Sequence, residues 1–110
     1  MNIKVPTVIL DGTVLALLDE QDLYGYAITK QVQQYLNVSE STMYPVLRRL
    51  QKDQMLTTYD EPFEGRNRRY YQITKTGKES LQNIKETWRD FSSAVDTLLL
   101  STENGGGTDA

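Results

Sequence analysis

The side chains most often used in catalysis are scarce in this sequence. Its 110 residues contain no histidine and no cysteine. This excludes a Ser-His-Asp triad, thiol nucleophiles, disulfides and metal sites built on imidazole or thiolate. Two carboxylate clusters remain, and both lie in polar, turn-like stretches where acidic side chains are normally solvated: Asp19, Glu20 and Asp22, then Asp60, Glu61 and Glu64. The sequence therefore predicts a protein that is not an enzyme and that uses no cofactor or metal.

A different chemistry is offered by the stretch 39–54, SESTMYPVLRRLQKDQ, which has the periodicity of a helix with two faces. One face is mostly apolar and is predicted to be buried; it holds Met43, Val46, Leu47, Leu50 and Gln54. The other is basic and hydroxyl-bearing; it holds Ser41, Pro45, Arg48, Arg49 and Lys52. Such a face is typical of a helix that enters a DNA major groove. Arg49 and Lys52 have two interpretations, as phosphate contacts or as solvated charges.

The charge distribution agrees with a nucleic-acid partner better than the total charge of −3 does. Residues 48–78 contain eight basic and four acidic side chains, which leaves +4 in this window and −7 elsewhere. Binding to phosphates follows the local field rather than the overall sum. The acidic total nevertheless supports a second hypothesis, an interaction module that binds protein and leaves its basic face unused.

The bulk properties indicate one soluble globular domain. A hydrophobic fraction of 38% with 25% charged residues is ordinary for this class. No apolar run approaches the roughly 20 residues that span a bilayer. The first residues, MNIKVPTVILDG, lack the basic region, apolar core and cleavage site of a signal peptide. We therefore expect a cytoplasmic protein without a membrane partner.

Two further helices are predicted before this basic stretch. After an arm that ends near Pro6, apolar spacing indicates a helix from Val8 or Leu10 to about Asp19. A second helix is predicted over 24–36, with Ile28, Val32, Tyr35 and Leu36 on one side. A turn at residues 37 and 38 leads to Ser39, a good N-cap, so the pair forms a helix-turn-helix unit. Pro45 removes a helical bond and predicts a kink or an irregular first turn.

Strand-like residues follow the helix-turn-helix unit. The run MLTTYD at 55–60 and the run RRYYQIT at 68–74 are separated by PFEGRN, which predicts a β-hairpin with a long basic tip. Tyr71 and Ile73 are expected to pack inward over the third helix. The pair Tyr70 and Tyr71 is interpreted as packing rather than as a stacking platform for single strands. A helix-turn-helix followed by such a hairpin is a winged helix.

The last predicted helix begins after a cap at Thr74 and carries an apolar stripe. The members of this stripe are Leu81, Ile84, Trp88, Phe91, Val95 and Leu98. Their spacing alternates between three and four residues, the rhythm of a coiled coil, and predicts a homodimer, with Leu81 also touching its own domain. The fold class is therefore α+β, mainly α with a small hairpin: a winged helix-turn-helix over 1–75, a dimerisation helix over 76–100 and a disordered tail over 101–110.

These motifs are similar to those of the PadR family of bacterial transcriptional regulators, in its short-tailed subgroup. The resemblance rests on LYGYAITKQV, STMYPVLRRLQKDQML and GRNRRYYQITKTGKESL, and it extends over roughly residues 9–100. The runs from Tyr44 to Leu50 and from Gly65 to Tyr71 are its most specific parts. Family members usually have glycine where this chain has Gln54, which is expected to affect turn geometry more than function.

The resemblance implies a homodimeric winged-helix repressor that binds double-stranded DNA at a pseudo-palindromic operator. Carried over by position, the DNA contacts would be Ser41, Thr42, Tyr44, Pro45, Arg48 and Lys52 on the helix, and Arg66, Asn67 and Arg68 on the wing. Arg48 is the best candidate for reading a base, because arginine pairs bidentately with guanine, while the wing arginines are assigned to phosphates. Trp88 either packs in the dimer interface, which we favour, or lines a site for a planar hydrophobic small molecule, as in multidrug-sensing relatives.

Overall fold

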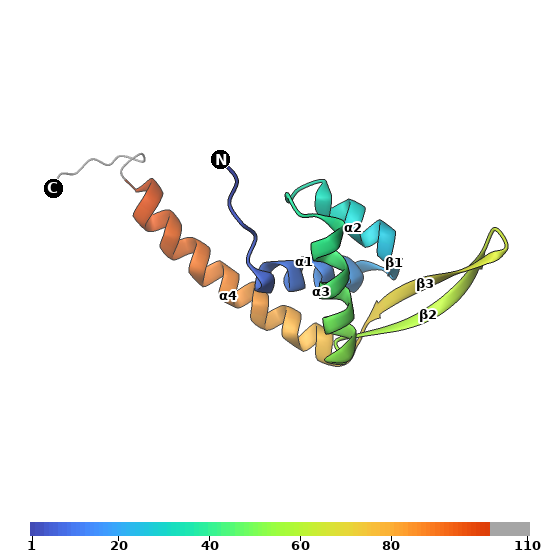
Figure 1. Ribbon diagram of the computed structural model, residues 1–110. Coiled ribbons are helices and arrows are strands. Elements are labelled where there is room, and N and C mark those ends of the chain that lie inside the picture. Colours follow the sequence, from blue (N-terminus) through green and yellow to red (C-terminus); the bar gives the residue numbers. More distant parts are fainter. Residues whose placement is uncertain (102–110) are drawn as a thin grey trace.

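The computed structural model describes residues 1–101, in which a β-hairpin and a long last helix extend from a helical body (Figure 1). The elements follow in the order α1 (Thr7–Glu20), β1 (Leu23–Tyr24), α2 (Gly25–Gln33), α3 (Glu40–Lys52), β2 (Leu56–Phe63), β3 (Arg66–Ile73) and α4 (Lys75–Leu100). The β2–β3 hairpin extends to one side and α4 to the other, so the longest dimension reaches 66 Å. The predicted fold class, a mainly α winged helix with a long last helix, is confirmed; the predicted tail from residue 102 onward lies outside the described residues.

The second helix is shorter than predicted. It ends at Gln33 rather than near Leu36, and the side chain of Tyr35 is 85% exposed instead of lying on the buried side. The chain turns early here because the Gln33 side-chain amide donates to the carbonyl of Val38 at 3.0 Å and closes the loop. Leu36 still packs against the core from within this loop.

Helix α3 begins as its sequence predicts. The Ser39 hydroxyl accepts a hydrogen bond from the Thr42 N–H at 3.2 Å, which satisfies one of the free donors of the first turn. The N–H groups of Thr42 and Met43 both reach the Ser39 carbonyl, so the predicted irregular first turn is absent. The helix continues through Pro45, whose side is exposed, where water can bond the carbonyl that the proline leaves free.

The end of α3 explains the position where glycine is usual. Gln54 has a φ of 64°, in the left-handed region. Its N–H bonds to the carbonyl of Gln51, and the N–H of Met55 bonds to that of Leu50. These two bonds form a Schellman motif, which normally places glycine at this residue. Gln54 was predicted to share the buried face of the helix, but it lies beyond the last turn and is exposed.

The sheet has one strand more, and a shorter turn, than the sequence suggested. Its antiparallel order is β1-β3-β2, with Leu23 opposite Tyr71. The predicted long tip, PFEGRN, is wrong, because strand pairing continues out to Phe63 and Arg66. Only residues 64 and 65 turn, with φ of 52° and 79°, as in a two-residue type I′ hairpin. Proline is tolerated within β2 because β2 is an edge strand.

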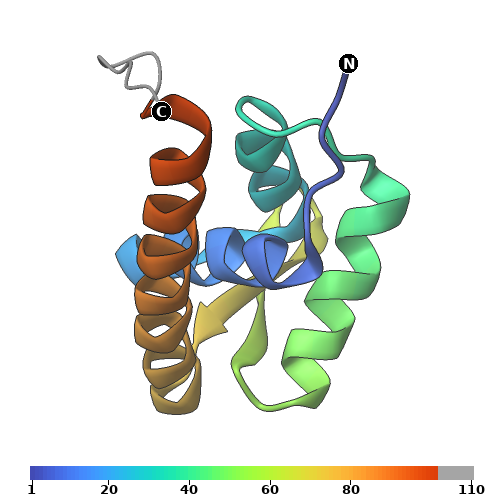
Figure 2. The same cartoon turned by 90° about the vertical axis from the view of Figure 1, so that its left-hand side faces the viewer.

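Helix α1 crosses the body between α3 and α4 and contacts both (Figure 2). Gly12 lies at the crossing with α4, where an added Cβ would come within 2.7 Å of the Ile84 Cγ2 atom. One turn away, Leu81 is 2% exposed and belongs to the hydrophobic core. Leu81 and Ile84, the first two members of the apolar stripe along α4, are therefore packed against their own chain, and the expectation that Leu81 contributes to a dimer interface is not supported.

Candidate nucleic-acid interface

The two faces of α3 have the environments that its sequence predicts. The apolar face is buried in the core through Met43, Val46, Leu47 and Leu50, none of them more than 6% exposed. All six predicted contact residues of this helix are exposed; they are Ser41, Thr42, Tyr44, Pro45, Arg48 and Lys52. Helix α3 thus presents one hydroxyl-bearing and cationic surface to solvent while its opposite side anchors it.

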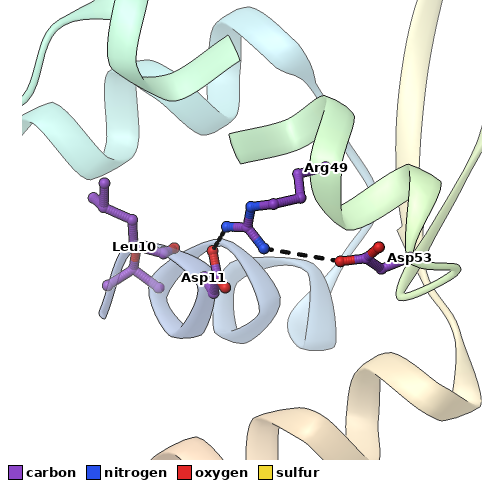
Figure 3. Close-up of polar contacts among 5 residues, drawn as sticks. Leu10, Asp11, Arg49 and Asp53 are labelled. Atoms are coloured by element: carbon purple, nitrogen blue, oxygen red, sulfur yellow. Dashed lines mark hydrogen bonds and ion pairs between the residues drawn. The ribbon is translucent and has the colours of Figure 1, made fainter. Parts of the chain in front are cut away.

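Arg49 does not belong to that surface. It reaches back to α1 and forms a hydrogen-bonded ion pair with Asp11, and its other terminal nitrogen lies 4.0 Å from a carboxylate oxygen of Asp53 (Figure 3). The hydrogen bond that Arg49 donates to Asp11 raises the pKa of the Arg49 guanidinium above its ordinary value. Both interpretations from the sequence, a phosphate contact and a solvated charge, are corrected by this contact: Arg49 ties α3 to α1.

One face of the β2–β3 hairpin is turned to α3, and we call it the α3-side face. Thr58 and Tyr71 are opposite one another on it. The Gln51 side-chain amide lies 3.5 Å from the Thr58 hydroxyl, and a Cβ on Gly25 would contact the rings of both Tyr44 and Tyr71, at 3.5 and 3.6 Å. The expected inward packing of Tyr71 and Ile73 is confirmed, since both pack against the core.

Farther along the hairpin, this same face carries a charged pair. Arg69 is opposite Asp60, two residues beyond the Thr58–Tyr71 pair on each strand, so strand alternation keeps it on the α3-side face. The Arg69 Nε atom lies 3.8 Å from an Asp60 carboxylate oxygen, and the two side chains are 62% and 50% exposed. An ion pair this exposed contributes little to stability.

The opposite face, which we call the outer face, is an aromatic cluster. The ring of Tyr70 stacks on Tyr59 at 5.7 Å and meets Tyr24 edge-on at 5.8 Å. The guanidinium carbon of Arg68 lies 3.9 Å from the Tyr24 ring centroid and 3.5 Å from that of Phe63. Tyr70 thus packs within the hairpin, as expected, but Arg68 is held between two rings instead of extending freely from the wing.

Asp22 connects this cluster to the loop before β1. One of its carboxylate oxygens accepts hydrogen bonds from the Tyr59 hydroxyl at 2.6 Å and from the Gln72 amide at 3.2 Å. The bond to Asp22 raises the pKa of Tyr59 to about 12. The sequence interpretation of Asp22 as a solvated charge missed this role. The alternation that places Tyr70 and Gln72 on one face was visible, but β1, which brings Asp22 and Tyr24 to that face, is only two residues long.

Beyond its contact with α1, helix α4 presents apolar side chains to solvent. Trp88, Phe91 and Leu98 are 48%, 60% and 81% exposed. Trp88 also borders an apolar groove of about 480 Å³ between α1, α2 and the middle of α4, which continues past Leu17 to Tyr35. Single exposed apolar side chains are normal on a monomer, but here they adjoin one another and an apolar groove. A contiguous apolar surface of this kind is typical of an interaction site.

Within residues 1–101, no group of three or more acidic side chains is arranged to hold a metal ion. No helix in that part of the chain combines the length and the apolar character that a membrane crossing requires.

Known proteins share both the sequence and this architecture. The model of the transcriptional regulator PadR-like family matches residues 14–83. Uncharacterized protein X of Lysinibacillus sphaericus is 31% identical over 99 residues, which cover 86% of this chain and 91% of that protein. The structure of smu.1704 from Streptococcus mutans has a TM-score of 0.83 and 29% identity, covering 99% of this chain and all of the other. Bacillus subtilis PadR, solved in complex with operator DNA, has a TM-score of 0.62 and 26% identity over 68% of this chain and 45% of its own. The chain belongs to the PadR-like family of transcriptional regulators.

Proposed function

We propose that this protein is a sequence-specific DNA-binding regulator that acts as a homodimeric repressor. The observation that carries the proposal is the exposed face of α3, where Arg48 and Lys52 extend from a helix whose other side is fixed in the core. A relative with the same fold has been solved in complex with operator DNA, which supports DNA as the partner. Ser41, Thr42, Tyr44 and Pro45 form the rest of this contact surface, and Arg66 and Asn67 lie at the end of the wing.

The specificity of α3 is assigned to Arg48. Its side chain is exposed at the middle of the helix, while the neighbouring Arg49 is held by Asp11. A bidentate arginine–guanine pair discriminates between bases by about 1–3 kcal/mol. Lys52, one turn farther along, is suited to a phosphate, which it contacts whatever the sequence.

The experiment begins with selection of bound duplexes from a random pool by the wild-type protein. Arg48→Ala is expected to reduce the ratio of operator to random-DNA affinity by a factor of about 5 to 150 for each half-site, because each protomer loses one bidentate pair. Lys52→Ala is the matched control and should weaken both affinities alike. An unchanged ratio in Arg48→Ala refutes the assignment of Arg48. Failure of the wild type to bind any duplex at low salt refutes the proposed function and favours a protein partner. Repression itself is tested with a reporter placed behind the selected operator.

The proposed homodimer rests on the part of the apolar stripe along α4 beyond Ile84. Trp88, Phe91 and Leu98 are exposed within residues 1–101, and Val95 between them is partly exposed. A second copy that buries them would place two α3 helices on one side of the DNA, as a two-fold operator requires. Leu98→Asp is expected to convert the protein to a monomer in sedimentation equilibrium. The control Ser93→Asp, on the opposite side of the same helix, should remain dimeric. An unchanged mass in Leu98→Asp refutes this interface.

The groove beside Trp88 supports a regulatory ligand, a planar hydrophobic molecule that releases the operator. Its lining is apolar apart from Gln31, Thr13 and Lys85 at its sides. Because Trp88 is the single tryptophan of the chain, its fluorescence reports directly on the groove. Quenching by a planar cationic dye, accompanied by loss of operator binding, is expected. A spectrum that does not respond to a dye panel refutes the ligand and leaves Trp88 as part of the dimer interface.

A further inference from the structure

Strand alternation separates the wing arginines into two groups. Arg69 is on the α3-side face, in register with Asp60, whereas Arg68 is on the outer face, in register with Glu61. Two observations identify the α3-side face: the Gln51 side chain of α3 lies 3.5 Å from the Thr58 hydroxyl, and the rings of Tyr71 and Tyr44 both border Gly25. A duplex bound against the exposed side of α3 would therefore meet Arg69 before Arg68.

The two arginines also differ in what already holds them. Arg68 lies over both the Tyr24 and the Phe63 rings, in the geometry of a double cation–π contact. Tyr24 belongs to β1 next to the start of α2, and Phe63 belongs to the outer end of β2. This stack therefore connects the far end of the wing to the helix-turn-helix unit. Moving Arg68 to a phosphate would break it.

Among residues 1–101, the contact that restrains the Arg69 guanidinium is its exposed pair with Asp60. The separation of 3.8 Å and the exposure of both side chains make this a weak interaction that a phosphate can replace. Before DNA binds, Asp60 partly neutralises Arg69, which reduces attraction to DNA that α3 does not also fit. The arrangement is suited to a phosphate contact that forms in register with α3.

We propose that, of the two neighbours Arg68 and Arg69, Arg69 contacts the DNA backbone and Arg68 is a positioning residue that holds the wing against Tyr24. This assignment rests on the proposed DNA-binding function. The resemblance to the PadR family, carried over by position, had instead implied that Arg68 contacts the DNA. Assigning the contact to Arg69 also gives Asp60 a role, as the group that Arg69 exchanges for a phosphate.

The test compares Arg69→Gln with Arg68→Gln on the duplex selected by the wild-type protein, at several salt concentrations. Each phosphate contact contributes about 0.9 to the slope of log K against log salt. Arg69→Gln is expected to reduce the slope by about this amount per protomer. Arg68→Gln should keep the wild-type slope and weaken binding severalfold at every salt concentration. Asp60→Asn should tighten binding more in the wild type than in the Arg69→Gln background, where only the repulsion between Asp60 and the phosphates is removed.

A second comparison examines the positioning role. Phe63→Leu removes one ring of the stack at an exposed site without changing any charge. It is expected to weaken DNA binding as Arg68→Gln does, and the double variant should be no weaker than either single one, since both break the same stack. Near-ultraviolet circular dichroism of the tyrosines should change in Arg68→Gln and not in Arg69→Gln.

Three results overturn the assignment. A slope that falls in Arg68→Gln but not in Arg69→Gln reverses the two roles. Equal reductions in both variants mean that both faces reach phosphates, and no reduction in either means that neither Arg68 nor Arg69 contacts the backbone. In all three cases the wild type still binds DNA, so they are distinguishable from failure of the proposed function, in which the wild type binds no duplex.

Discussion

Replacing Gln54 with glycine is expected to stabilise the protein. Gln54 has a φ of 64° at the residue that ends α3 and begins the connection to β2. A residue with a side chain loses about 1–2 kcal/mol in this conformation, because its Cβ approaches the following carbonyl. Glycine avoids that cost but has about 0.5–1 kcal/mol more backbone entropy to lose on folding. The difference predicts that Gln54→Gly increases the free energy of unfolding by about 0.5–1 kcal/mol.

The matched control is the same substitution in the middle of a helix. Gln82 is exposed within α4, and Gln82→Gly is expected to lower the free energy of unfolding by about 1 kcal/mol because no left-handed strain is relieved. Urea denaturation at one fixed protein concentration measures both changes, since the stability of a dimer depends on concentration. If Gln54→Gly destabilises the protein as Gln82→Gly does, the left-handed end of α3 does not exist in solution.

Three more predictions test contacts around the site. Asp11→Asn and Arg49→Gln should each lower the free energy of unfolding by about 1 kcal/mol. The double variant should lower it by about as much as one single variant. Additive losses in urea titration would contradict the ion pair between α1 and α3. Gly77→Ala should cost about 3 kcal/mol, because its Cβ would collide with the backbone carbonyl that precedes β2; an unchanged melting temperature would contradict this packing. The raised pKa of Tyr59 means that its hydrogen bond to Asp22 contributes fully below the ordinary tyrosine pKa of 10.0 and is lost as pH rises through about 12. Ultraviolet titration should show this late tyrosinate signal in the wild type, and its persistence in Asp22→Asn would exclude Asp22 as the cause.

The sequence predicts α3 well because a single period determines both of its faces. Apolar side chains at helical spacing specify Met43 and Leu50 as buried without any knowledge of the partner helices. The role of Arg49 could not be predicted from helical periodicity. This residue lies at the border between the two faces, and its partner Asp11 is 38 residues away in the sequence, so only the packing of α1 against α3 determines its role.

The sequence predicted the β-hairpin of the wing but not the length of its strands or of its turn. Proline and glycine in PFEGRN indicate a loop, yet β2 tolerates Pro62 at the sheet edge and the turn needs only two residues with positive φ. Glu64 is not a residue that type I′ turns favour, so the short turn has no clear sequence signal. The outcome affects function directly. A six-residue flexible tip would leave its one arginine, Arg66, free, whereas paired strands assign Arg66, Arg68 and Arg69 each to a face.

Helix α1 connects the parts of the molecule that the proposed function requires. Asp11 bonds α3 through Arg49, and the next residue, Gly12, packs against Ile84 of α4. Two consecutive residues thus fix both the helix assigned to DNA and the helix assigned to the second copy. In the proposed dimer, a change in how α4 crosses α1 would alter the distance between the two α3 helices and leave the side chains that face the DNA unchanged. A ligand in the groove beside Trp88 would act at this crossing, because Gly12 and Ile84 line that groove as well.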